Sequence, residues 1–401
     1  MNRKQRRATA KLGSPAEAHF NLGNAKMGQG KLDEAIAAFR RAISIKPDVA
    51  EAHSNLGNAL MEQGKLDEAI AAYRQAIGIK PDLAEAYSNL GIALAGQGKL
   101  DEAIAAYRRA ISIKPDYAEA HSNLGIAVKS QGKLDEAVTA CRRAIGIKPD
   151  FAEAYSNLGN ALMEQGKLDE AIAAYRRAIG IKPDYEDVHY NLGHVLALQG
   201  KLDEAIAAYR RAIGIKPGFS KAFSSLLFGL NYDDKSTNED LFAAHREWDE
   251  RYGQRVPRFT AYTNDRDPAR RLRIGYLSPD FRQHSVAYFV EPLLRGYDRH
   301  KVEVFCYAEV TRPDLVTTRL QGLADHWLVT VALSDQRLAE RIRTDGIDIL
   351  VDVAGHTGNR LLVFARKPAP VQVTWLGYPN TTGLKAIDYR LVARFNQFER
   401  I

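Results

Sequence analysis

Several residue types that mark particular protein classes are scarce in this chain of 401 residues. It has only two cysteines, Cys141 and Cys306, which lie far apart in the sequence and predict neither a disulfide framework nor a metal site. It has no run of 18 apolar residues, which excludes a membrane-spanning helix. Its basic start is not followed by an apolar stretch, so no secretory signal is expected. Together these absences favour a reducing cytoplasm.

Positive charge is in modest excess, with a formal net charge of +7. Some of the basic residues crowd the N-terminal tail, and many of the others recur at a fixed spacing where helices are expected to begin or end. A solvated tail and ordinary helix ends explain this distribution better than a nucleic-acid surface does. Neither nucleic acid nor a membrane is therefore an expected partner. Residues 1–15 are expected to form a basic, disordered tail.

A 34-residue period organises residues 16–219. The segment AEAHFNLGNAKMGQGKLDEAIAAFRRAISIKPDV, residues 16–49, recurs five more times up to residue 219. Glycine holds one position in every copy: Gly23, Gly57, Gly91, Gly125, Gly159 and Gly193. Alanine holds a second position, and proline a third. This is the signature of TPR repeats, whose helix pairs stack into a right-handed superhelix with a long concave groove.

Each copy predicts two helices. In the first copy, helix A runs from about Glu17 to Met27 and ends where glycines follow. Helix B begins near Asp33, whose charge favours the helix N-terminus, and Pro47 stops it. Its apolar residues follow the period of one helical face. Small residues at the repeated glycine and alanine positions are expected to let the two helices approach closely.

An asparagine precedes the repeated leucine of helix A in every copy: Asn21, Asn55, Asn89, Asn123, Asn157 and Asn191. Helix A normally lines the groove of such a solenoid. Because an amide both donates and accepts hydrogen bonds, a ladder of asparagines can hold an extended acceptor peptide by its backbone. The alternative is that each asparagine only bonds within its own repeat. The sequence leaves both interpretations open.

Residues 220–271 are expected to cap the solenoid and to connect it to the rest of the chain. SKAFSSLLFGLNYDD, residues 220–234, predicts a capping helix. STNEDLFAAHREWDERYG then predicts an amphipathic helix with Leu241, Phe242, His245 and Trp248 on one side. Residues 254–271 are polar, hold two prolines and predict a linker or loop.

From residue 272 the pattern changes to alternating strands and helices. Strands are predicted at 273–278, 302–310, 347–355 and 371–379, and helices at 285–297 and 334–346. This alternation indicates a doubly wound α/β sheet that binds ligands beyond the carboxyl ends of its strands. Three loops at such ends are rich in polar residues and glycine: residues 278–284, 355–360 and 377–383. Neither a P-loop nor a GxGxxG motif is present, so ATP hydrolysis and simple dinucleotide binding are unsupported.

Three segments of this second region resemble the family of O-GlcNAc transferases and SPINDLY-type protein O-glycosyltransferases. They are GYLSPDFRQHSVAYFVEPLL, DILVDVAGHTGNRL and RKPAPVQVTWLGYPNTTGLKAIDYRL. The resemblance covers the repeats, the bridging helix with AHREW and residues 272–391, and it is closer to the SPINDLY branch. It implies a TPR superhelix followed by a two-lobed GT-B transferase that modifies Ser or Thr hydroxyls of proteins. The implied donor is UDP-N-acetylglucosamine or GDP-fucose, no metal is implied, and acceptor proteins would lie in the TPR groove.

The resemblance also implies site residues. His284 matches the active-site histidine of the first catalytic lobe, where an imidazole could take the proton of the attacking hydroxyl. The residues alone allow a second interpretation, a helix-start histidine bonded to Asp280. The implied sugar-pocket residues are His356, Thr357, Leu376, Gly377 and Pro379. His300 and His326 match no motif, and surface or core roles are expected for them.

The family usually continues after a segment matching residues 388–391 into a second lobe that supplies most contacts to the nucleotide. Here VARFNQFERI follows, up to residue 401. The expected fold class is therefore an α-solenoid of TPR repeats followed by an incomplete α/β Rossmann-like lobe, residues 272–401. We expect little or no transferase activity from this polypeptide alone, and a truncated or frameshifted reading frame. The competing hypothesis is a non-catalytic TPR scaffold for protein–protein interaction. The sequence leaves the donor, the acceptors and the oligomeric state open.

Overall fold

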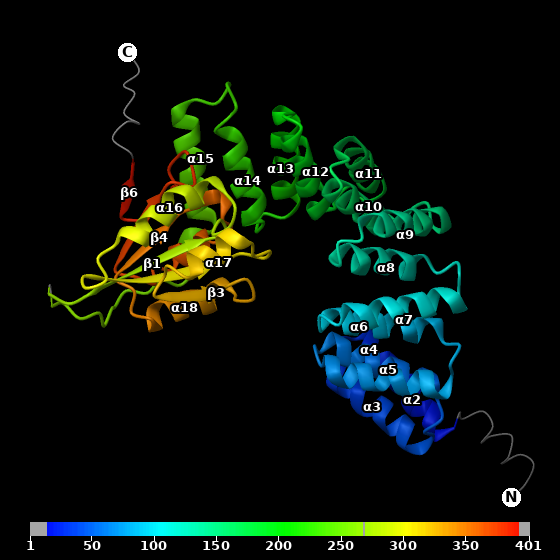
Figure 1. The fold of residues 1–401 in the computed structure, drawn as a ribbon. Coiled ribbons are helices and arrows are strands. Elements are labelled where there is room, and N and C mark those ends of the chain that lie inside the picture. Colours follow the sequence, from blue (N-terminus) through cyan, green and yellow to red (C-terminus); the bar gives the residue numbers. More distant parts are fainter. Residues whose placement is uncertain (1–13, 268, 393–401) are drawn as a thin grey trace, which may run out of the picture. The chain divides into compact units, whose positions relative to one another are not determined.

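A computed structural model describes residues 14–267 and 269–392 (Figure 1). The chain divides into two compact units, Met1–Val188 and His189–Ile401. Most of the predicted N-terminal tail, residues 1–13, lies outside the described residues. The helical repeats begin at once after it, because the side chain of Ser14 caps the first described helix and Pro15 is its first residue.

The first unit is built from helix pairs, which confirms the predicted solenoid of repeats. Each helix A packs against its own helix B, and each helix B against the next helix A. The bounds are α2 Pro15–Gly28, α3 Leu32–Ile45, α4 Ala50–Glu62, α5 Leu66–Ile79, α6 Ala84–Gly96, α7 Leu100–Ile113, α8 Ala118–Ser130, α9 Leu134–Ile147, α10 Ala152–Glu164 and α11 Leu168–Ile181.

The repeated glycine of helix A is required by close packing against helix B. A methyl group at Gly57 would lie 2.6 Å from a ring carbon of Tyr73 on the partner helix, and the same approach recurs in the other repeats of this unit. The fourth repeat differs, because Cys141 takes the place of the aromatic residue and its sulfur would lie 2.7 Å from a methyl group at Gly125. The aromatic ring therefore fills the space that glycine leaves empty.

The recurring charges of the first unit pair between neighbouring repeats. Arg40 lies 2.8 Å from Glu68, and the equivalent pair Arg142–Glu170 measures 2.9 Å. Side-chain amides follow the same periodicity, since Gln63 donates to Asp33 at 2.8 Å. Such exposed pairs contribute little stability each, about 0–1 kcal/mol. They nevertheless account for part of the basic residues that recur with the repeat.

Four helices of the second unit precede its sheet. The helix α12, Glu186–Leu198, begins at the unit boundary, and α13 Leu202–Ile215, α14 Ser220–Leu230 and α15 Asn238–Arg251 follow. Thr237 and Asp240 form a capping box at the start of α15. Leu241, His245 and Trp248 are buried as predicted, but Phe242 is 55% exposed. The prediction for Phe242 is wrong because the buried stripe of α15 is narrower than its apolar pattern.

The sheet has six parallel strands in the order β3-β2-β1-β4-β5-β6. The strands are β1 Leu272–Ser278, β2 Val302–Ala308, β3 His326–Val329, β4 Ile349–Asp352, β5 Val371–Trp375 and β6 Tyr389–Leu391. The chain runs outward from β1 to β3, returns to the centre and continues from β4 to β6. The order therefore reverses between β1 and β4, which is where a doubly wound sheet opens a crevice for ligands.

Helices join these strands and cover the sheet. They are α16 Ser285–Gly296, α17 Leu315–Gln321, α18 Asp335–Thr344 and α19 Leu361–Ala365, with short 3₁₀ turns at Gly253–Arg255 and Gly355–Thr357. Val290 and Leu294 of α16 pack with Cys306 of β2 in the main core. Tyr307, which points to the opposite face of the same strand, donates to Asp345 at the end of α18. Throughout the described part of the chain, no helix combines the length and the apolar character needed to cross a bilayer.

The segment predicted as a linker, residues 254–271, is held against the lobe. The Phe259 backbone amide donates to the Arg366 carbonyl at 2.8 Å, and Asn264 donates to Asp348 at 2.6 Å. Arg270 makes two hydrogen bonds to the same Asp348 carboxylate, which is nearly buried. This stretch thus completes the lobe, although its described residues form no regular element beyond part of one short 3₁₀ turn.

Candidate functional site

The loops after β1 and β4 flank the point where the strand order reverses. The β1 loop, residues 279–284, ends at His284, and the β4 loop, residues 353–360, contains His356. A third loop, residues 376–383, follows the neighbouring strand β5 and is the β5 loop below. A methyl group at Gly358 would lie 3.5 Å from Pro279, and one at Gly355 would lie 2.4 Å from Tyr378. The β4 loop therefore contacts both the β1 loop and the β5 loop at this edge of the sheet.

The β1 loop places His284 as the cap of α16. Its Nδ1 accepts a hydrogen bond from the Val286 backbone amide at 3.3 Å and lies 3.8 Å from the Asp280 carboxylate. In this arrangement the neutral ring carries its proton on Nε2, so it can donate there but can accept a proton only by releasing Val286. The side chain is 39% exposed and accessible to a ligand. Burial raises the pKa of Asp280, and the nearby His284 and Arg282 partly offset that rise.

The β4 loop is held by Asp352, which the sequence analysis did not single out. Its carboxylate accepts from the backbone amides of Ala354 and Gly355 at 3.1 and 2.8 Å and from the Thr374 hydroxyl at 2.8 Å. Burial raises the pKa of this carboxyl group, and these hydrogen bonds oppose the rise. In the sequence, Asp352 is a single acidic residue at the end of an apolar strand, and this pattern could have identified it. Asp352 positions the loop between β4 and β5.

His356 is buried and bonded at both ring nitrogens. Nδ1 lies 3.1 Å from the Ser224 hydroxyl of α14, and Nε2 lies 2.9 Å from the Thr382 carbonyl. The ring can therefore donate to Thr382 and accept from Ser224 only as the neutral tautomer with its proton on Nε2. Burial, with the neighbouring His245, lowers the pKa of His356 to about 3. The imidazole thus joins the β4 and β5 loops to α14. Its place at a sugar pocket stays a prediction.

Tyr378 completes this buried polar cluster. Its hydroxyl lies 2.7 Å from His245 Nε2 on α15 and accepts from Asn231 at 2.8 Å. The rings of His245 and His356 lie 5.2 Å apart. His245 was predicted on the apolar face of α15, and Tyr378 had no predicted role. The two helices before the sheet are therefore tied to the β4 and β5 loops by hydrogen bonds.

The remaining predicted sugar-pocket residues lie on the same loops. Thr357 donates to the Ala354 carbonyl at 2.6 Å, within the β4 loop. Leu376 has a positive φ of 72°, which is costly for a leucine and marks a constrained turn. Gly377 packs directly on the backbone of Val353. Pro379 is exposed, and its carbonyl accepts from Arg390 at 2.8 Å. Their place at a sugar pocket stays a prediction.

The repeated asparagines of the first unit divide into bonded and free side chains. Asn55 donates to Asn24 at 2.8 Å, Asn89 to Asn58 at 2.9 Å and Asn157 to Ser122 at 3.0 Å. These bonds join neighbouring repeats rather than staying within one. Asn21 and Asn123 make no side-chain hydrogen bond to any residue that the structure describes. Asn191 belongs to α12 of the second unit.

Asn123 lies in a hollow of the groove within the first unit. A cavity of about 470 Å³ is lined by this residue, by Asn89 and Asn157, and by Ile92 and Ile126. The two isoleucines take the position that Asn24 and Asn58 hold in earlier repeats, and they are 39% and 42% exposed. Ile92 cannot accept a hydrogen bond as Asn58 does from Asn89, and no other described side chain bonds Asn123, so its amide stays available to a ligand.

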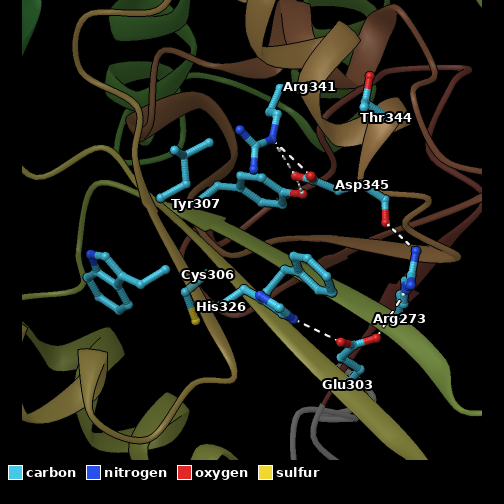
Figure 2. Close-up of a pocket in the computed structure, with 11 residues that line it drawn as sticks. Arg273, Glu303, Cys306, Tyr307, His326, Arg341, Thr344 and Asp345 are labelled. Carbon is cyan, nitrogen blue, oxygen red and sulfur yellow. Dashed lines mark hydrogen bonds and ion pairs between the residues drawn. The ribbon is translucent and has the colours of Figure 1, made fainter.

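A separate cavity is lined by residues of β1, β2, β3 and the end of α18, and by none of the loops just described. Its volume is about 410 Å³, and Figure 2 shows the side chains around it. His326 and Arg273 both contact Glu303, at 2.8 and 3.1 Å, while Arg341 and Tyr307 bond Asp345. These charges neutralise each other in pairs, so the cavity offers a ligand no unbalanced charge. His326 thus has a structural place near the surface, as expected.

Comparisons with known proteins match both parts of the chain. Residues 255–396 match the model of glycosyl transferase family 41, and residues 1–222 match that of the cilia and flagella-associated protein 70 C-terminal domain, a TPR model. The Arabidopsis thaliana protein named "Probable UDP-N-acetylglucosamine--peptide N-acetylglucosaminyltransferase SPINDLY" is 42% identical over 170 residues, which are 41% of this chain and 19% of that protein. The Caenorhabditis elegans "UDP-N-acetylglucosamine--peptide N-acetylglucosaminyltransferase" is 41% identical over 122 residues, 30% of this chain and 11% of that protein.

A solved structure resembles the chain more extensively. It is a mutant of the Thermobaculum terrenum O-GlcNAc transferase, with 39% identity and a TM-score of 0.63 over 68% of this chain and 53% of that one. The alignments span about a fifth or less of the length of the curated relatives. The solved structure covers more of this chain than residues 255–396 alone, so the likeness extends beyond the region that matches glycosyl transferase family 41.

Proposed function

We propose that the chain belongs to glycosyl transferase family 41, in the group of O-GlcNAc transferases and SPINDLY proteins that it resembles, and that it is the repeat region and first lobe of a protein O-glycosyltransferase. The enzyme would transfer a sugar from a nucleotide-sugar donor to Ser or Thr hydroxyls of acceptor proteins. The donor would be UDP-N-acetylglucosamine or GDP-fucose, the reaction would need no metal ion, and a reducing cytoplasm would suit the two free, buried cysteines.

One observation supports this proposal most directly. The β1, β4 and β5 loops meet at the carboxyl edge of the sheet, beside the reversal of strand order between β1 and β4. The half-exposed His284 stands there at the N-terminus of α16. In the reaction, the hydroxyl oxygen forms a bond to the anomeric carbon, the bond to the diphosphate breaks, and the hydroxyl loses its proton. His284 is suited to orient that hydroxyl, or to take its proton once Nδ1 is released.

The transfer reaction tests this role of His284. The chain would be incubated with labelled donor and a Ser/Thr-containing acceptor protein, alone and with a separately expressed fragment of the Thermobaculum terrenum O-GlcNAc transferase that holds the part of that protein not covered by this chain. Incorporation is expected in the complemented mixture, and His284→Ala should lower its rate about 10²- to 10⁴-fold. His326→Ala serves as a matched control, because this histidine lies on the edge strand β3 and lines a separate cavity.

A second candidate function is a non-catalytic scaffold that binds proteins through its groove. It is favoured by the length of the groove that the helix pairs of the first unit form. Sugar incorporation that is absent in every mixture, while acceptor binding persists, would favour the scaffold over the enzyme.

Both candidates require polypeptide binding in the groove, and Asn123 is the residue that tests it. Asn123→Ala is expected to weaken binding of an extended Ser/Thr-rich peptide roughly tenfold, because a free amide can make two backbone hydrogen bonds of about 1 kcal/mol each. Asn89→Ala is the matched control in the same cavity, since the Asn89 amide already donates to Asn58. Fluorescence anisotropy of a labelled peptide measures both. Equal losses in the two variants would contradict a special role of Asn123.

A further inference from the structure

A large cavity inside the second unit joins the last repeat to the β4 loop. Its volume is about 690 Å³, within the range of ligand-binding cavities. Side chains of α12, α13 and α14 form its walls, and His356, Thr357 and Asn359 of the β4 loop also line it. The cavity therefore opens beside the loop that the proposed function places at the transfer site.

Apolar side chains are exposed around this cavity. Leu198 is 58% exposed, Phe228 38% and Tyr232 62%, and all three line it. Phe228 and Tyr232 also contact each other edge to face, with ring centres 5.2 Å apart. A group of large apolar side chains that stays exposed around a cavity is typical of a binding site.

The same cavity contains an uncompensated positive charge. The Lys221 ammonium lies 5.1 Å from the centre of the Tyr190 ring. Among the residues that the structure describes, no carboxylate forms an ion pair with Lys221. Several lysines and arginines of the repeats, by contrast, have an acidic partner nearby, as Arg40 and Arg74 do. Lys221 is therefore free to attract an anionic group of a ligand.

From this lining we propose that the cavity binds the acceptor polypeptide through one large apolar or aromatic side chain, with an adjacent carboxylate at Lys221. The inference rests on the proposed function, since it assigns the acceptor a sequence preference close to the transfer site. A nucleotide fits the lining less well. A diphosphate needs several cationic or backbone donors, whereas one ammonium and mainly apolar walls are present.

The preference is tested with three labelled peptides of equal length on the full chain, without donor. Their central pairs are Phe–Glu, Ala–Glu and Phe–Lys in the same Ser/Thr-rich background. The Phe–Glu peptide is expected to bind at least about tenfold more tightly than the other two, a difference of about 1.4 kcal/mol. Lys221→Glu should reverse the preference between Phe–Glu and Phe–Lys, and Lys301→Glu, which changes an 81% exposed lysine elsewhere, should not.

A second variant keeps the proposal testable if Lys221→Glu does not fold. Tyr232→Ala removes an exposed ring and should weaken the Phe–Glu peptide several-fold while the Ala–Glu peptide is unaffected. Equal affinities for the three peptides, an unchanged preference in Lys221→Glu, or displacement of the peptide by UDP or GDP would each overturn the proposal. Because no sugar is transferred in this assay, its failure is distinguishable from a failure of the proposed function.

Discussion

Gly377→Ala is expected to destabilise the second unit by about 3 kcal/mol. A methyl group at Gly377 would lie 2.0 Å from the Val353 carbonyl oxygen and 2.8 Å from the Ala354 Cα. These are backbone atoms of the β4 loop, so no rotation of a side chain can relieve the overlap. The β4 and β5 loops would have to separate, and the buried cluster around His356 would open with them.

Gly296→Ala is the matched control, because a methyl group there meets no atom within 4 Å and the residue ends α16. Its unit should keep its stability or gain up to about 1 kcal/mol. Urea unfolding followed by tryptophan fluorescence measures both variants selectively, since Trp248, Trp327 and Trp375 all belong to the second unit. Equal unfolding midpoints for Gly377→Ala and Gly296→Ala would show that the loops are not in tight contact.

The second unit is also expected to lose stability as the pH falls from neutral to 5. His356 stays neutral in the folded chain because burial lowers its pKa to about 3, whereas an unfolded histidine titrates near 6.5. Between these two values the unfolded state binds more protons, so the free energy of unfolding falls with falling pH. At pH 5 this amounts to roughly 2 kcal/mol, from 1.5 pH units at 1.36 kcal/mol each. His245 acts in the same direction, since burial also lowers its pKa.

The same tryptophan signal measures this pH effect. The urea midpoint is compared at pH 7.5 and pH 5 in the unaltered chain and in His356→Asn, which removes the titrating ring. The variant should be less stable at pH 7.5 but should show a clearly smaller loss at pH 5. His53→Asn, in α4 of the first unit, should leave the pH dependence of the tryptophan signal unchanged. A pH dependence that persists in full in His356→Asn would disprove the assignment to this ring.

Regular elements with a strong local pattern could be predicted from the sequence. The helix pairs of the repeats, the strands β1, β2, β4 and β5, and the helices α16 and α18 were all expected within a few residues of their observed bounds. The short elements β3, β6, α17 and α19 were not. His326–Val329 has four residues at the sheet edge and no alternation, so only its pairing with β2 makes it a strand. The seven residues of Leu315–Gln321 are too few to show a helical period.

The candidate site was predicted in part. The three loops follow from the strand pattern, because carboxyl ends of parallel strands share one edge of the sheet. Asp352 and Tyr378 went unassigned, since each acts through partners that the sequence does not place beside it. The free amide of Asn123 depends on Ile92 in the preceding repeat, a relation that becomes visible only once the stacking of repeats is known.

The sequence by itself determined the repeat period, the strands that carry the three loops and the resemblance to a family of protein O-glycosyltransferases, because each depends on residues close together in the chain. The tertiary structure alone decided that Ser224, His245 and His356 share one buried cluster, and that an unpaired Lys221 stands beside the β4 loop. Hydrogen bonds and cavities join residues more than a hundred positions apart, and no local periodicity records which of them will meet.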